Sequence, residues 1–350
     1  MPHDISEDAD RTGGARPARQ TSAAARASLL DTAPYRIGSV TLIVRDLDGL
    51  TRFYQDAVGL AVVSQEAGVV RLGVEGRVLL ELRHDPAARP WSPREAGLFH
   101  TAFLLPSRGD LGAWLTHAAE RGIHLSGASD HLVSEAVYLT DPEGNGIEIY
   151  VDRPVAAWPR AAGGTIVMRN DPLDHAGLVR AASGPWMSMP AGGRIGHVHL
   201  QVGALEPAEA FYAGLLGFDV MCRYPGAVFL SSGGYHHQLA ANVWNSRGAP
   251  VRPAGMAGLA EVELLTRPEI LTAVRPRSLE VGLPVGLRAG LPVAEPGDAL
   301  VLKDPWGTRL RLASEGAAGG SALSGAAEGG SAEAADLAER PAGFGSVPRV

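Results

Sequence analysis

The chain has 350 residues, with 31 Lys and Arg against 38 Asp and Glu, a formal net charge of −7 and 45% hydrophobic residues. This length suits about two domains, and the composition is typical of a globular protein with an ample core. The acidic balance and the lack of a long basic cluster argue against a nucleic-acid partner. The single cysteine, Cys222, excludes an internal disulfide and a cysteine-built zinc site.

The sequence offers no membrane segment and no secretion signal. No apolar run reaches the roughly 18 residues of a membrane span. The N-terminus carries Asp and Glu in place of the apolar centre of a signal peptide. We therefore expect a cytoplasmic protein without a membrane partner.

From residue 37 onward the predicted elements repeat one unit of a strand, a helix and three strands. The first unit is predicted as a strand at 40–44, a helix at 47–58 and strands at 61–64, 69–74 and 77–82. The second is predicted as a strand at 99–105, a helix at 110–121 and strands through 131–139 and 146–151. The third has strands from 195 and at 219–223, 227–231 and 236–242, and the fourth has a strand at 259–265, a helix at 268–279 and strands up to 300–312.

Short matching segments support this repeat. Ile195-Gly-His-Val matches Ile37-Gly-Ser-Val, and the Phe211-Tyr212 pair matches Phe53-Tyr54 at the same offset. These aromatic pairs are predicted as core packing between helix and sheet. The turn Asp304-Pro-Trp-Gly likewise echoes the turn Asp141-Pro-Glu-Gly.

One such unit leaves a curved sheet with an unburied face, so the units must pair. The sequence therefore predicts an α+β fold of four βαβββ modules, paired into two domains with mixed, curved sheets. Along the chain we expect a disordered tail at 1–34, a first domain at 37–153, a linker at 154–193 with a helix at 173–182, a second domain at 194–313 and a disordered tail at 314–350.

Alignment of the modules gives each one two positions that face the hollow of its sheet, one on the first strand and one on the last. In module order these positions are Ser39 and Glu81, His100 and Glu148, His197 and His237, and Ala260 and Arg311. If the first module pairs with the second, neither hollow holds two histidines and a carboxylate. If the second pairs with the third, one hollow holds His100, Glu148, His197 and His237. We prefer this second arrangement because it brings all the candidate metal-binding side chains into one hollow.

His100, Glu148 and His197, here called the triad, form a two-histidine, one-carboxylate set. Such a set leaves open positions on a metal for a chelating substrate and O₂, and it suits iron(II) (Fe²⁺), with manganese(II) (Mn²⁺) as the alternative. Taken singly, each histidine would more often be a core or edge residue, and only its companions favour a ligand.

Two choices between neighbouring histidines stay open. His197 and His199 share one face of a strand, and the module alignment favours His197 as the ligand and His199 as a supporting residue. His236 and His237 point to opposite faces, and the neighbouring pattern favours His237 as the inward residue.

The stretch 131–148 resembles the signature of the extradiol ring-cleavage dioxygenases in the vicinal oxygen chelate superfamily. The matching residues are His131, Val137, Tyr138, Asp141, Pro142, Gly144 and Glu148, and Ser129 departs from the pattern. Residues 196–200 and 235–240 resemble two further motifs of these enzymes. Across roughly 37–313, the chain is most similar to bacterial four-module catechol 2,3-dioxygenases.

The resemblance implies that the triad binds iron(II) and that the substrates are a catechol and O₂. It also implies that His237 is the acid/base, and that Tyr138 and His131 bind substrate and stabilise developing oxyanion charge. Members of the superfamily often associate, so a homo-oligomer is left open. Two other functions stay open as well: a metal-dependent isomerase or lyase of the glyoxalase type, which needs four ligands, and a protein that sequesters a small molecule.

Overall fold

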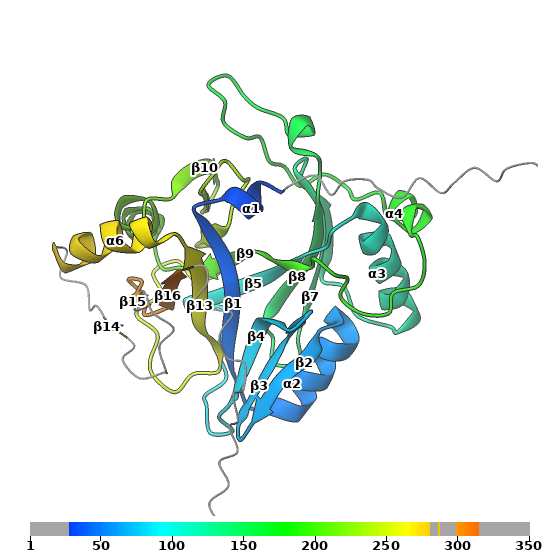
Figure 1. The fold of residues 1–350 in the computed structure, drawn as a ribbon, viewed down its shortest axis with the longest axis horizontal. Coiled ribbons are helices and arrows are strands. Elements are labelled where there is room, and N and C mark those ends of the chain that lie inside the picture. Colours follow the sequence, from blue (N-terminus) through cyan, green and yellow to red (C-terminus); the bar gives the residue numbers. More distant parts are fainter. Residues whose placement is uncertain (1–27, 281–285, 288–298, 315–350) are drawn as a thin grey trace, which may run out of the picture.

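The structure is a computed structural model, shown in Figure 1, and it describes residues 28–280, 286–287 and 299–314. Except for Ser314, the expected tail at 314–350 lies outside these residues, and so does most of the expected tail at 1–34. Within the described residues, no helix is long and apolar enough to cross a membrane.

The first two modules and the short helix that precedes them occupy the first half of the chain. Their elements are α1 (Leu29–Thr32), β1 (Tyr35–Val44), α2 (Leu47–Phe53), η1 (Tyr54–Val58), β2 (Ala61–Glu66), β3 (Val69–Val74), β4 (Arg77–His84), β5 (Gly97–Leu104), α3 (Arg108–Glu120), β6 (Gly127–Asp130), β7 (Ser134–Thr140) and β8 (Gly146–Asp152).

A connecting segment and the last two modules follow. Their elements are η2 (Val155–Ala157), α4 (His175–Ala181), β9 (Arg194–Gln201), α5 (Leu205–Glu209), η3 (Ala210–Leu215), β10 (Asp219–Tyr224), β11 (Ala227–Ser231), β12 (Leu239–Asn242), β13 (Gly258–Thr266), α6 (Pro268–Glu280), β14 (Gly286–Leu287), β15 (Leu300–Lys303) and β16 (Arg309–Ser314).

The described strands form two eight-stranded mixed sheets. One has the order β14-β15-β16-β13-β1-β4-β3-β2, and the other has the order β10-β11-β12-β9-β5-β8-β7-β6. Within each module the first and last strands are parallel neighbours, as in β5 with β8, and the modules join through the antiparallel pairs β1–β13 and β5–β9. This confirms the α+β class and the pairing of the second module with the third. Because each sheet takes strands from both halves of the chain, the division into domains at 37–153 and 194–313 stays a prediction.

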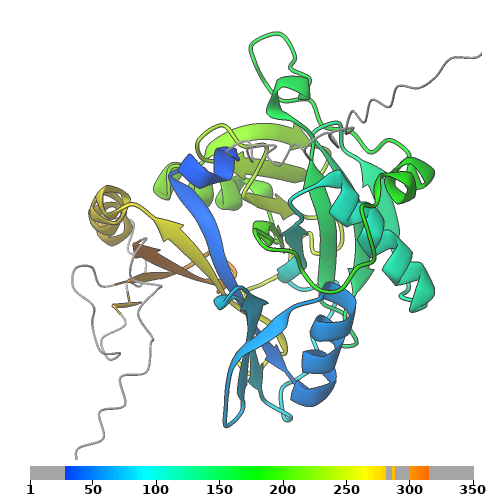
Figure 2. The same ribbon diagram turned by 45° about the vertical axis from the view of Figure 1, so that its right-hand side comes forward.

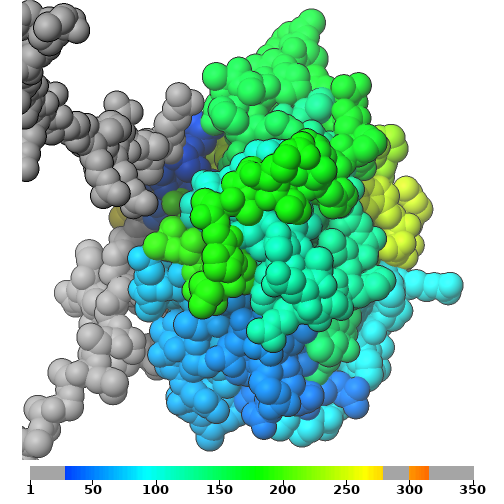
Figure 3. All heavy atoms as spheres, turned by 90° about the vertical axis from the view of Figure 1, so that its right-hand side faces the viewer, coloured from blue at the N-terminus to red at the C-terminus, as the bar shows by residue number. Residues whose placement is uncertain are grey.

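Helices cover the outer side of the first two modules. In Figures 1 and 2, α2 and α3 lie on the same side of the molecule, and Trp114 of α3 donates a hydrogen bond to the carbonyl of Ala57 in η1 at 2.8 Å. Helix α4 packs on α3, and Figure 3 shows it on the same face of the molecule. The segment expected as a linker is therefore packed against the second module, and its Trp158 is buried.

Buried tyrosines bond the turns at Asp141 and Asp304 to the module that precedes each turn. The Tyr54 hydroxyl donates to Asp141 Oδ2 at 3.0 Å, and the Tyr212 hydroxyl donates to Asp304 Oδ2 at 2.9 Å. Burial and the nearby Asp141 raise the pKa of Tyr54 well above its ordinary value, so it keeps its proton as a donor. The tyrosines link modules one to two and three to four, and the sheets link the other two pairs, so all four modules are connected in a ring.

Three expectations need correction. The strand expected at 131–139 begins only at Ser134, because a separate strand, β6, precedes it and the chain turns back between the two. His131 lies in that turn next to Leu132, whose φ is +68°. The strand expected at 236–242 begins only at Leu239. Residues 28–34, expected in a tail, include α1, whose Leu30 is buried in a cluster with Tyr235.

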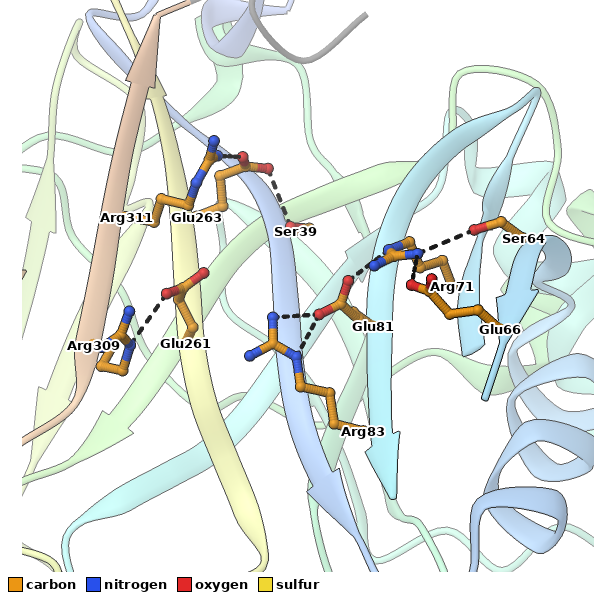
Figure 4. A network of polar contacts seen from close by, with 10 residues as sticks. All are labelled: Ser39, Ser64, Glu66, Arg71, Glu81, Arg83, Glu261, Glu263, Arg309 and Arg311. Carbon is orange, nitrogen blue, oxygen red and sulfur yellow. Dashed lines mark hydrogen bonds and ion pairs between the residues drawn. The ribbon is translucent and has the colours of Figure 1, made fainter. Parts of the chain in front are cut away.

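The second hollow differs by one position from the expected set. Figure 4 shows Ser39, Glu81 and Arg311 on one side of the sheet, where their fourth-module neighbours are Glu261 and Glu263. Ala260 was expected there, but a one-residue slip in a strand reverses the face. Ser39 donates to Glu263 at 3.1 Å, and Arg311 pairs with the same carboxylate.

Every carboxylate in that hollow has an arginine partner. Glu81 pairs with Arg71 at 2.6 Å and also with Arg83, and Glu261 pairs with Arg309 at 3.3 Å. The described carboxylates of the second hollow are thus held in ion pairs with arginines.

The turn at Asp141 gives a stability prediction. Its Oδ1 accepts the backbone N–H groups of Glu143 and Asn145 at 2.9 and 2.8 Å, and its Oδ2 accepts Tyr54 and the Asn145 amide. Asp141→Ala leaves buried donors without an acceptor, so we expect a loss of about 2–4 kcal/mol in the free energy of unfolding, measured by urea denaturation. Asp141→Asn keeps one acceptor oxygen and should lose less; an equal loss in both variants would contradict this account.

Candidate metal centre

The strand register brings the triad together. Ala102 of β5 pairs with Glu148 of β8 on one side and with His197 of β9 on the other. Side chains that are directly paired point to the same face of a sheet, and so do residues two apart in a strand. His100, two residues before Ala102, therefore points to the same face as Glu148 and His197.

The three ligand atoms form a compact triangle. Glu148 Oε2 lies 3.0 Å from His100 Nε2 and 3.2 Å from His197 Nε2, and the two Nε2 atoms are 3.3 Å apart. Metal–ligand bonds of about 2.1 Å at right angles would put neighbouring ligand atoms about 3.0 Å apart. The triangle therefore fits three ligands on one face of an octahedral ion, the arrangement typical of non-haem iron(II) oxygenases.

The protonation states also suit a cation. Burial alone would raise the pKa of Glu148, but the His197 and His100 imidazoles outweigh it and hold this pKa well below its ordinary value. Burial lowers the pKa of His197 to about 4. At neutral pH the site therefore offers a carboxylate and an uncharged imidazole with a free lone pair, which are the forms that bind metals.

His199 lies two residues beyond His197 on the same face of β9 and is also buried. Its Nε2 accepts a hydrogen bond from the Asn242 amide at 3.0 Å, so this nitrogen is already in use. Among the described residues, the one group of convergent ligand atoms is His100, Glu148 and His197. The geometry thus favours His197 over His199 as the ligand.

His237 faces the triad from the loop that precedes β12. Its ring centroid lies 4.1 Å from that of His197. The strand position that corresponds to Glu148 is Ala240, which pairs with His199 as Glu148 pairs with Ala102. His237 therefore reaches the hollow from a loop and not, as expected, from the last strand of its module.

Tyr138 and His131 are joined by a short hydrogen bond. His131 Nδ1 lies 3.0 Å from the carbonyl of Arg169, which can only accept, so in the neutral ring Nδ1 carries the proton. Nε2 then accepts the hydroxyl of Tyr138 at 2.6 Å. Burial and the charge of Glu148 raise the pKa of Tyr138 well above its ordinary value, so Tyr138 holds this proton.

A cavity of about 510 Å³ opens above the triad and is lined by all six predicted site residues. This volume lies within the range of roughly 300–1,000 Å³ for small-molecule sites. The apolar part of its wall includes Phe99, Val133, Met168, Cys222, Phe229 and Trp244. These residues come from several strands and loops, so most of them could not have been inferred from the sequence.

Known proteins share this architecture. Residues 36–149 and 194–263 match the family described as Glyoxalase/Bleomycin resistance protein/Dioxygenase superfamily. Catechol-2,3-dioxygenase of Bacillus subtilis is 42% identical over 228 residues, which cover 64% of this chain and 80% of that protein. Biphenyl-2,3-diol 1,2-dioxygenase 3 of Rhodococcus globerulus is 29% identical over 33% of this chain and 63% of its own length.

A solved structure gives the same fold. Glyoxalase I from Zea mays superposes with a TM-score of 0.51 at 16% identity, over 81% of this chain and 93% of that one. The sequence relatives confirm the expected class of enzyme, an extradiol dioxygenase. The chain belongs to the Glyoxalase/Bleomycin resistance protein/Dioxygenase superfamily.

Proposed function

We propose that the protein is an iron(II)-dependent extradiol dioxygenase that opens a catecholic ring next to its hydroxyls with O₂. The observation that carries this proposal is the triangle of His100, Glu148 and His197 beneath a cavity of small-molecule size. The relative named catechol-2,3-dioxygenase supports the substrate class. Manganese(II) is the alternative metal, because it accepts the same ligands.

The triad would hold the ion through two neutral imidazoles and one carboxylate. Bound iron(II) supplies a chelation point for the two catechol oxygens and a position for O₂ beside them. His237 would take a proton from the diol on binding and return it during ring opening. Tyr138, held by His131, would donate its hydroxyl proton toward developing oxyanion charge, and the apolar wall would exclude water from the ring.

Two other functions fit less well. A glyoxalase-type isomerase or lyase needs a fourth ligand, and His237 lies outside the group of convergent ligand atoms found among the described residues. A protein that only sequesters a small molecule has no need of three buried ligands, and burying such polar groups costs free energy. A cytoplasmic location and a homo-oligomer remain predictions.

The first prediction tests the reaction. Protein loaded anaerobically with iron(II) and mixed with catechol and O₂ should consume one O₂ per catechol and give the coloured ring-opened product. An oxygen electrode and absorbance measure the two quantities together, with manganese-loaded protein as a parallel arm. No product across a panel of substituted catechols, with metal bound, would refute the proposal.

The second prediction tests the ligands. Glu148→Gln removes the one negative charge of the triad, so we expect iron affinity to fall at least about 100-fold, measured by metal titration and elemental analysis. The matched control is Glu81→Gln, because Glu81 pairs with Thr41 in the other sheet as Glu148 pairs with Ala102. Equal metal loss in both variants would mean that Glu148 acts through folding alone.

The third prediction separates metal binding from proton transfer. His237→Gln should keep the metal content of the wild type, because the triad is intact, and should lower kcat by about 10²–10⁴-fold, the usual contribution of a general acid/base. Loss of iron in this variant would instead assign His237 as a fourth ligand.

A further inference from the structure

The mechanism leaves unused a row of buried polar groups behind His237. His236 is completely buried, its Nδ1 lies 2.8 Å from His237 Nδ1, and its Nε2 lies 2.9 Å from Asp152 Oδ1. Asp152 is the last residue of β8. A buried histidine pair that ends on a carboxylate needs an explanation, because burying polar groups costs free energy.

We infer that Asp152 and His236 are positioning residues that fix the tautomer and the ring orientation of His237. This inference rests on the proposed function of His237 as the acid/base. Residues that hold a catalytic imidazole in this way act through their hydrogen bonds and need not touch the substrate.

The proton positions follow from the carboxylate. Ionised Asp152 can only accept, so His236 Nε2 carries a proton toward it. In neutral His236, Nδ1 is then a lone pair, and the facing Nδ1 of His237 must carry the proton of that 2.8 Å contact. His237 is left with an unprotonated Nε2.

That nitrogen is available to act as a base. His237 lines the cavity, and among the described residues no hydrogen-bond partner reaches its Nε2. The network thus presents a lone pair to the bound diol.

Further contacts hold Asp152 in place. The Tyr235 hydroxyl donates to the same Oδ1 at 3.0 Å and lies 2.8 Å from the Tyr150 hydroxyl. Burial raises the pKa of both tyrosines well above their ordinary values, so they remain donors and cannot reverse the direction of the network. Trp158 packs against His236, with ring centroids 5.3 Å apart, and closes this side of the network.

Nitrogen-15 NMR of the full-length protein tests the tautomer without substrate or turnover. The protein is loaded with zinc(II), which is diamagnetic and accepts the same ligands. Spectra are recorded at about pH 8, which is above the ordinary histidine pKa. We expect His237 protonated at Nδ1 and His236 protonated at Nε2. His237 protonated at Nε2 would overturn the inference. A correct tautomer in a protein that fails the catechol test would refute the proposed function alone.

A pair of variants tests the role in turnover. The amide of His236→Asn lies near the former Nδ1 and can still accept from His237, whereas the amide of His236→Gln lies near the former Nε2 and reaches Asp152. We expect kcat to fall about 10-fold or less for Asn and about 10²-fold or more for Gln, with KM within about 3-fold and metal content unchanged. If His236 only fills space, the larger Gln will retain as much activity as Asn, and the inference is wrong.

Discussion

The antiparallel junction between β5 and β9 is the constraint on which the candidate site depends. The second module supplies His100 and Glu148, the third supplies His197, and neither holds the triad alone. The register sets Ala102 between Glu148 and His197. A slip of one residue would turn a whole strand to the opposite face. The buried residues that fix this register, such as Phe103 and Val198, therefore decide whether the site exists.

The two sheets have the same topology, but they differ in the side chains that contact their buried carboxylates. In the second hollow Glu263 meets Arg311, a guanidinium that stays protonated and cannot bind a metal. In the first hollow Glu148 meets two imidazoles, which offer lone pairs once they are neutral. A buried carboxylate needs a compensating cation in either case. In the sheet that holds Glu263, the chain itself supplies the cation as Arg311. In the sheet that holds Glu148, the ligand atoms fit a metal ion taken up from solution.

The sequence predicts what is periodic and repeated. The four modules follow from alternation and from the constant offset between matching segments, and the convergence of the triad follows from the preferred pairing of the second module with the third. The errors fall where these signals fail. Strand β6, Gly127–Asp130, consists of small and polar residues with no apolar alternation, so its existence and the turn at His131 were missed. Ala260 was misplaced by one position, because the β13 residues that pair with Arg309 and Arg311 are Glu261 and Glu263.

The position of Asp152 likewise depends on contacts with residues that are distant from it in sequence. Glu148, Tyr150 and Asp152 alternate onto one face of β8, so a single strand carries the carboxylate of the metal centre and that of the His236 network. Between them, the ring of Tyr150 lies against His197, with centroids 5.0 Å apart.

This arrangement explains the glycine of the repeated Ile-Gly-x-Val segment. A Cβ on Gly196 would lie 1.8 Å from the Tyr150 hydroxyl, and a Cβ on Gly38 would lie 2.5 Å from Glu263 Oε2. In both sheets the residue that needs this space comes from the partner module, the second module for Gly196 and the fourth for Gly38. The glycine is therefore required by the crossing of modules and not by backbone conformation. The same segment that reveals the repeat thus also marks where one module must admit a side chain from another.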